Sequence, residues 1–227
     1  MLILHTSDWH LGRSFKSTSL LGDQKAFINE LIEVVKGRRV DLVVIAGDIF
    51  VRGLPPAEAV VIWNDALARI IETGAQVVAI AGNHDQGERI EMKPALTNPA
   101  VVVRGTREAS LATMEFDDGP LTVVTVPFLD PFMARDLSQG EGAATHQSVI
   151  EGALAVVADE VAKSDRSLVV AHTFVTGGQE SESERSLLQV GGSDQVGAQV
   201  FDGYSYAALG HLHRPQEVGG PIVAYSG

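Results

Sequence analysis

Strand-length apolar runs alternate with amphipathic helical patterns in the first part of the chain, and this alternation constrains the fold more than any other feature. The runs cover residues 2–7, 42–46 and 77–81. Consecutive strands that are continuously apolar are typical of strands buried on both faces. A strand–helix–strand–helix–strand order of this kind predicts a parallel sheet whose two faces are both covered.

Helical spacing fills the intervals between these runs. We expect Asp23 to cap a helix that runs to about Arg39. Its buried face repeats at helical spacing and comprises Ile28, Leu31, Ile32 and Val35. Pro55 and Pro56 are expected to open a second helix that ends at Gly74. Its core stripe comprises Trp63, Leu67, Ile70 and Ile71.

Beyond residue 99 the pattern changes to short strands separated by turn residues. Val101–Val103, Leu111–Phe116 and Leu121–Val126 are expected to form an antiparallel or mixed second sheet. A helix is expected next, because apolar residues recur there at helical spacing, at Ile150, Leu154, Val157 and Val161. Further strands are expected at 168–171, 204–209 and 222–227, with a long loop at 176–198 that includes a short strand at Leu187–Val190.

Polar side chains follow five of these strands directly. They are Asp8, His10, Asp48, Asn83, His84, Asp85, His172, His211 and His213. Five of the seven histidines fall in this set, whereas His5 reads as a core or supporting histidine and His146 as an exposed one. Each motif alone is an ordinary exposed turn. Open α/β sheets build their sites at the carboxyl ends of strands, so the repetition predicts one shared site.

These residue types are ligands for borderline to hard divalent metals. The chain has no cysteine, so any metal must be held by oxygen and nitrogen atoms. The share of imidazole favours Mn, Fe or Zn over Ca or Mg.

Asp8 and His10 are two residues apart on a strand, so their side chains are expected to share one face, with Trp9 on the opposite face. Seven candidate ligands exceed one tetrahedral site and favour two metals that share a bridging carboxylate and act on a phosphoryl group. His84, beside Asp85, is a candidate unligated general acid or phosphate contact.

The ordered series of motifs resembles the calcineurin-like metallophosphoesterases. It comprises Asp8-x-His10, Gly47-Asp48, Gly82-Asn83-His84-Asp85, His172 and Gly210-His211-x-His213. Further segments are similar to the DNA-nuclease subunits of bacterial complexes that contain an SMC-like ATPase. These are Thr6–Gly12, Gly47–Phe50, Ser183–Arg185, Val190–Gly192 and Ala208–Pro215.

The resemblance implies an α/β fold, a four-layer α/β/β/α sandwich of two mixed sheets flanked by helices. It assigns one metal to Asp8, His10, Asp48 and His213. It assigns the other to Asp48 as the bridge, Asn83, His172 and His211. His84 would act at the scissile phosphate, oriented by Asp85.

The activity implied by the resemblance is manganese-dependent DNA cleavage in repair, recombination and replication. Members act as 3′-to-5′ exonucleases and as single-strand or hairpin endonucleases, and their partners are DNA and the SMC-like ATPase. Homodimerisation is a further expectation. Residues 1–227 then correspond to the nuclease domain, without the DNA-capping and ATPase-binding regions. Val51 and Gln86 depart from the usual residues, but neither position is a ligand in the family.

The net charge of −12 counts against a protein that binds nucleic acid through a broad basic face. A phosphodiesterase or phosphatase that acts on a small substrate therefore stays open as the alternative. A catalytically idle scaffold would need a broken ligand set, and none of the seven positions is broken. No transmembrane run and no signal peptide are read from the sequence, so a cytoplasmic location is expected.

Overall fold

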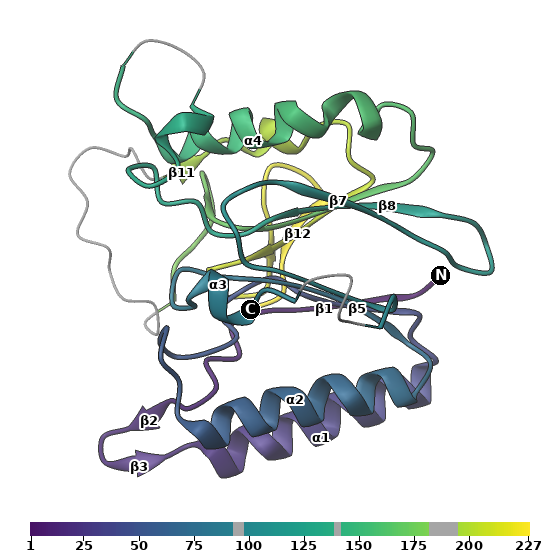
Figure 1. Ribbon diagram of the computed structural model, residues 1–227, viewed down its shortest axis with the longest axis vertical. Helices are drawn as coiled ribbons and strands as arrows, with labels where there is room; N and C mark the ends of the chain where they lie inside the picture. The colour runs from purple at the N-terminus through teal and green to yellow at the C-terminus, as the bar shows by residue number, and fades with distance from the viewer. Residues whose placement is uncertain (93–97, 139–141, 182–194) are drawn as a thin grey trace.

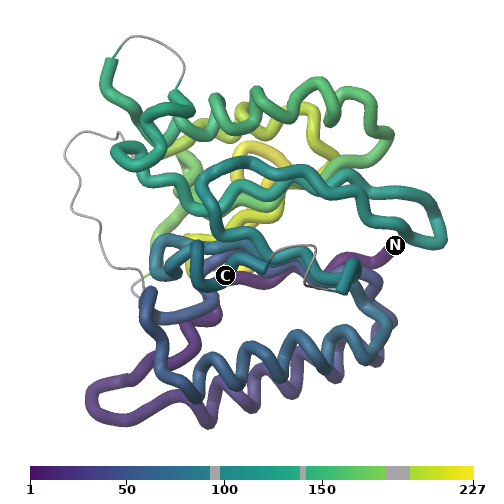
Figure 2. The backbone as a smooth tube through the Cα atoms, in the orientation of Figure 1, coloured from purple at the N-terminus to yellow at the C-terminus, as the bar shows by residue number. Residues whose placement is uncertain are grey.

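The computed structural model describes residues 1–92, 98–138, 142–181 and 195–227. Two β-sheets stack face to face and helices cover their outer faces, which gives the four layers seen in Figure 1 and, as a backbone tube, in Figure 2. The expected α/β/β/α sandwich is confirmed. The suggested strand at 187–190 lies outside the described residues.

The first sheet is parallel throughout. Its strand order is β1 (Ile3–Thr6), β4 (Leu42–Ile45), β5 (Gln76–Ile80) and β6 (Val101–Arg104). The Val101–Val103 run was predicted to belong to the second sheet, and this prediction was wrong. Sheet membership depends on the pairing partner, and Val101 pairs in parallel with Val77 of β5.

The second sheet is mixed, as expected. Its order is β13 (Gln216–Glu217), β14 (Val223–Tyr225), β12 (Tyr206–Gly210), β9 (Ser167–His172), β8 (Leu121–Val126) and β7 (Ser110–Met114). The inner strands are parallel to one another, and β7 and β13 pair antiparallel at the two edges.

The long helices lie on the outside. Helices α1 (Leu21–Arg38) and α2 (Ala57–Glu72) cover the first sheet, and α4 (His146–Val161) covers the second (Figure 1). Shorter elements are α3 (Gly87–Ile90), the 3₁₀ turns η2 (Arg135–Leu137) and η3 (Ala198–Phe201), and two strand pairs. These pairs are β2 (Ser14–Phe15) with β3 (Thr18–Ser19), and β10 (Phe174–Val175) with β11 (Gln195–Val196).

Strand alternation explains why the strands are apolar throughout. Leu42 and Val44 of β4 point into the core between the two sheets, whereas Val43 and Ile45 pack under α1 and α2. Each face of the strand therefore lies in a different core, so every position is apolar. The first sheet is covered by helices on one face and by the second sheet on the other.

Helix α1 buries the predicted residues, but its N-terminus differs from the prediction. Ile28, Leu31, Ile32 and Val35 of α1 are buried as expected. Asp23 is not the cap: the helix begins at Leu21, and Asp23 lies in its first turn, where a carboxylate still suits the helix dipole. Among the described residues, no helix has the length and apolar character needed to cross a membrane.

Candidate metal centre

The carboxyl ends of strands from both sheets meet at one edge of the sandwich. All seven predicted ligands lie there, on the loops that follow β1, β4, β5 and β12 or at the end of β9. They are Asp8, His10, Asp48, Asn83, His172, His211 and His213. Contacts between these side chains, given below, join residues up to 203 positions apart in the sequence.

The first loop positions Asp8 and His10 by an unexpected backbone conformation. β1 ends at Thr6, and both residues are left-handed, with φ of 56° and 43°. They therefore converge without the strand alternation that the sequence analysis assumed. Trp9 does point away, as expected: it is buried, and its Nε1–H donates to Thr6 Oγ1 at 3.0 Å.

Glycines allow the loops to approach closely. A Cβ atom on Gly82 would collide with Asp48, and one on Gly47 would collide with the His172 ring. A Cβ atom on Gly210 would meet the Ala46 carbonyl. Each of these glycines directly precedes a predicted ligand, so the repeated Gly-polar pattern reflects the lack of space between the strand ends.

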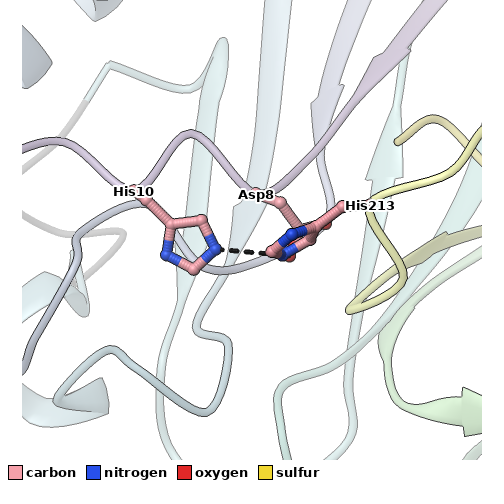
Figure 3. A group of neighbouring side chains, drawn as sticks. All are labelled: Asp8, His10 and His213. Carbon is pink, nitrogen blue, oxygen red and sulfur yellow. Dashed lines mark hydrogen bonds and ion pairs between the residues drawn. The ribbon is translucent and has the colours of Figure 1, made fainter. Parts of the chain in front are cut away.

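One half of the centre is formed by Asp8, His10 and His213 (Figure 3). The Nε2 atoms of His10 and His213 are 3.2 Å apart, and His213 Nε2 is 3.6 Å from Asp8 Oδ1. Asp8 Oδ2 accepts a hydrogen bond from the His211 amide at 3.1 Å. Its other oxygen, Oδ1, is buried without a hydrogen-bond partner. A buried carboxylate oxygen without a donor is costly unless a cation satisfies it.

The other half is formed by Asn83, His172 and His211. Asn83 Oδ1 lies 3.0 Å from His172 Nε2 and 3.1 Å from His211 Nδ1. His172 Nδ1 lies 2.8 Å from the Ala46 carbonyl, which can only accept, so Nδ1 carries the proton. In neutral His172, Nε2 is therefore an acceptor that faces the acceptor oxygen of Asn83. A cation between the two atoms resolves this pairing.

Asp48 lies between the two halves. Its Oδ2 atom is 3.7 Å from His10 Nε2 on one side and 3.6 Å from His172 Nε2 on the other. Its Oδ1 atom accepts from the His84 amide at 2.9 Å, which fixes the carboxylate. Asp48 is 2% exposed, so its charge is compensated by neighbours and not by bulk water. This placement is the one that a bridging ligand requires.

The donor set and its spacing fit divalent cations. Ligand atoms at about 2.1 Å from one metal lie roughly 3–3.5 Å from each other in tetrahedral or octahedral geometry. The contacts within and between the halves run from 3.0 to 3.7 Å. The assignment of each residue as a ligand stays a prediction, because His84 Nε2, 3.9 Å from Asp48 Oδ2, groups equally well with His10 and Asp48.

Burial sets the protonation of the centre. It lowers the pKa of His10 to about 4 against the opposing charge of Asp48, and burial together with His172 lowers the pKa of His211 to about 3. Burial alone would raise the pKa of Asp8, but its interaction with His213 and the nearby His172 hold this pKa well below the usual range. A metal ion binds imidazoles in their neutral form and carboxylates in their ionised form, so these shifts favour metal binding.

His84 is positioned by the backbone and not by its sequence neighbour. The Val51 carbonyl accepts a hydrogen bond from His84 Nδ1–H at 3.1 Å, which leaves Nε2 facing the centre. The family resemblance had implied that Asp85 orients His84. Instead, Asp85 accepts from three backbone amides, those of Ile49 at 3.0 Å, Phe50 at 2.8 Å and Gly82 at 2.9 Å. It joins the β4 loop to the β5 loop, and burial with the charge of Asp48 raises its pKa to about 6.

The two remaining histidines have distinct environments. His5 bridges the sheets: its Nε2–H donates to the Leu209 carbonyl at 3.0 Å, and Nδ1 accepts from the Tyr206 hydroxyl at 3.1 Å. It is the hydrogen-bonded core histidine that we expected. His146 begins α4 and is half-buried where the sequence predicted an exposed side chain, because its ring packs 5.6 Å from that of Phe128.

Sequence reasoning missed Gln24 on α1. Its side-chain amide donates to the Trp9 carbonyl at 3.2 Å and to the His10 carbonyl at 2.8 Å, and its Oε1 accepts from the Gly12 amide at 3.0 Å. Gln24 therefore holds the loop that carries His10. A polar residue in an amphipathic helix gives no sequence signal for such a contact.

The comparisons with known proteins agree with this geometry. The calcineurin-like phosphoesterase family, Metallophos, matches residues 1–215. The chain belongs to this family. Members of the calcineurin-like phosphoesterase family are metal-dependent hydrolases of phosphoesters, and the His and Asp clusters described above suit that chemistry.

Solved structures share the calcineurin-like phosphoesterase fold. TT1561 of Thermus thermophilus matches with a TM-score of 0.56 at 13% identity, over 99% of this chain and 88% of that one. The calcineurin-like phosphoesterase YfkN from Bacillus subtilis matches with a TM-score of 0.51 at 14% identity, over 98% of this chain and 80% of that one. At these identities the likeness concerns the fold alone.

Proposed function

We propose that this phosphoesterase is a manganese-dependent DNA nuclease of the SbcD kind, active as a 3′-to-5′ exonuclease and as a single-strand or hairpin endonuclease in the cytoplasm. Its partner would be SbcC, an SMC-like ATPase, in DNA end processing. The motif series and the SbcD-like segments around Trp9 and Arg214-Pro215 support this proposal. The observation that carries it is a basic surface beside the centre.

Two neighbouring loops form this basic surface, residues 12–20 and 51–56. They lie side by side, because Leu11 bridges to Phe50 and the Val51 amide donates to the Leu11 carbonyl at 3.2 Å. Together they carry Arg13, Lys16 and Arg52, all exposed, and neither loop contains an Asp or Glu. In a chain of net charge −12, a carboxylate-free cationic surface next to the centre favours a polyanionic substrate.

An aromatic side chain projects from the same surface. Phe15 is 66% exposed, and the Lys16 ammonium lies 5.6 Å from its ring centroid. Proteins that bind single-stranded nucleic acid combine cations along the backbone with aromatic rings that stack on bases. A small phosphate ester without an aromatic group would have no base to stack on the Phe15 ring.

The chemistry follows from the centre. Divalent cations there would polarise the phosphoryl oxygens and lower the pKa of water. Asp8, Asp48, Asn83 and the imidazoles would hold them. His84 Nδ1–H donates to the Val51 carbonyl, so in the imidazolium form Nε2–H would point at the centre and could give its proton to a phosphate oxygen or a leaving alkoxide, which would leave a neutral imidazole.

Homodimerisation is part of the proposal. Apolar side chains are exposed on the outer helices, with Phe27 at 43% and Val34 at 48% on α1, and Val61 at 66% on α2. Exposed apolar groups on adjacent helices favour association with a second apolar surface. Sedimentation of the protein over a concentration series would test this.

The experiment compares cleavage of a labelled single-stranded oligonucleotide with hydrolysis of a chromogenic phosphodiester, both with Mn²⁺. Neutralising the basic surface by Arg13→Gln, Lys16→Gln and Arg52→Gln should raise KM for the oligonucleotide and flatten its salt dependence. The matched control removes the same charge at the far end of α1, by Lys36→Gln, Arg38→Gln and Arg39→Gln. Hydrolysis of the diester without cleavage of DNA would instead support the small-substrate alternative, which the net charge favours.

A further inference from the structure

A second exposed aromatic ring lies on the loop that follows β8, defined here as the β8 loop, residues 127–137. β8 is parallel to β9, so this loop leaves the sheet at the edge where His172 lies. The Phe128 amide donates to the Ala81 carbonyl at 2.9 Å, directly before the Gly82-Asn83 turn. The Phe128 ring centroid is 6.3 Å from that of His172. The β8 loop therefore borders the half of the centre that contains His172.

Hydrogen bonds hold the tip of the β8 loop in one conformation. Asp130 Oδ1 accepts from the amides of Phe132 at 2.9 Å and Met133 at 3.1 Å. The Asp130 carbonyl accepts from the Ala134 amide at 2.8 Å, and Ala134 itself is buried. The loop thus presents Phe132 from a fixed backbone, and ordering it on binding costs little.

Phe132 is 77% exposed, and the Arg135 guanidinium carbon lies 6.0 Å from its ring centroid. Among the described residues Arg135 has no carboxylate partner. An exposed phenylalanine carries an unfavourable hydration free energy that packing elsewhere in this chain does not relieve. A cation beside the ring adds attraction for an anionic or π-rich ligand.

The Phe132–Arg135 pair has a counterpart in the Phe15–Lys16 pair. These are the two cation–π pairs found in the described part of the chain, and both aromatic rings are exposed. One follows the Asp8–His10 loop, and the other borders the His172 half. In Figure 1, the β2–β3 hairpin and the β8 loop both lie on the left side of the molecule.

We propose that Phe132 and Arg135 form a nucleobase-stacking site, so that a single-stranded substrate is held on both sides of the metal centre. This inference rests on the proposed nuclease function. Stacking on Phe132 reads no sequence, because every base has a π-face. The site would hold the strand in register with the scissile phosphate.

The test scans an abasic position along single-stranded oligonucleotides and measures kcat/KM with Mn²⁺. In the wild type, one abasic position should lower kcat/KM by roughly 5- to 150-fold, the range for one stacked base. Phe132→Ala should lower kcat/KM for the intact strand by the same factor. In this variant, an abasic site at that position should cause no further decrease in kcat/KM. Phe132→Trp should restore the dependence, and Arg135→Gln should weaken it. Val156→Ala, which removes another exposed apolar side chain on α4, serves as the control and should match the wild type.

Identical abasic profiles for the wild type and Phe132→Ala would overturn the inference and leave the nuclease function intact. A Phe132→Ala variant that lowers kcat/KM equally at every abasic position would overturn it in the same way. Hydrolysis of a chromogenic diester without any oligonucleotide cleavage would overturn the proposed function, and this inference with it. Thermal melting of each variant separates these outcomes from misfolding.

Discussion

Single residues at the metal centre adopt backbone conformations that side chains usually avoid. Positive φ angles occur at four predicted ligands, with 56° at Asp8, 43° at His10, 50° at Asp48 and 108° at His211. Each such residue costs about 1–3 kcal/mol and persists only where the surroundings hold it in place. Here neighbouring strand ends do so: the Asp8 amide donates to the Gly47 carbonyl at 3.0 Å, and the His10 amide to the Asp48 carbonyl at 2.9 Å.

The prediction at this scale concerns His84. Its Nδ1–H is held by the Val51 carbonyl and its side chain is 25% exposed, more than that of Asp48 or His172. His84→Gln should lower kcat by roughly 10²–10⁴-fold, the usual contribution of a general acid. Metal content, measured by elemental analysis after dialysis against Mn²⁺, should stay at the wild-type value. Loss of metal in parallel with activity would show that His84 is a ligand.

Most helices and strands could be predicted from the sequence, but the segments that they pair with or contact could not. Apolar runs and helical spacing predicted β4, β5, β9 and α4, because the apolar residues that a strand or a helix buries recur at a characteristic spacing along the sequence. The sheet to which β6 belongs, the left-handed turn at Asp8 and the amides held by Asp85 depend on contacts between segments distant in sequence. The seven ligands could be named because they recur after strands; Gln24 could not, because no pattern marks it.

Helix α1 acts on the centre through Gln24, which gives the prediction at the scale of elements. Gln24→Leu removes two donors and one acceptor that hold the loop at residues 9–12. We expect Mn²⁺ affinity to fall about tenfold and the free energy of unfolding to fall by about 3 kcal/mol, at a typical ~1 kcal/mol for each of the three lost hydrogen bonds. Mn²⁺ titration and urea denaturation measure the two effects.

The control for this prediction is Lys25→Ala, an exposed neighbour on the same helix turn. It should leave both quantities at wild-type values. Wild-type Mn²⁺ affinity in Gln24→Leu, despite lower stability, would restrict Gln24 to a structural role.

The whole molecule depends on contact between its two sheets, since each sheet supplies part of the centre. Apolar side chains from β4, β5, β8, β9 and β12 form the core between them. His5 adds a polar link from β1 to β12 through the Leu209 carbonyl and the Tyr206 hydroxyl. Both hydrogen bonds can form with a neutral imidazole, whereas protonation would place a positive charge on a ring enclosed between the sheets, so protonation of His5 opposes the docking of the sheets.

This link predicts a pH dependence of stability. Burial lowers the pKa of His5 from its ordinary 6.5 to about 4. The unfolded chain therefore takes up this proton first, and stability decreases as the pH falls from 6.5 to 4, by at most about 3 kcal/mol. His5→Gln should reduce this slope. Urea denaturation with a chelator present, at pH 7.0, 5.5 and 4.5, would show it; parallel curves for the two proteins would contradict the role of His5.

The most direct test of the central claim is the number of divalent cations bound per chain, in the wild type and in Asp48→Ala. Asp48 Oδ2 lies between His10 at 3.7 Å and His172 at 3.6 Å, and so would join the two halves. Equilibrium dialysis against Mn²⁺ should give two ions per wild-type chain and loss of both in Asp48→Ala. A full complement in Asp48→Ala, or a single ion in the wild type, would contradict the two-metal centre.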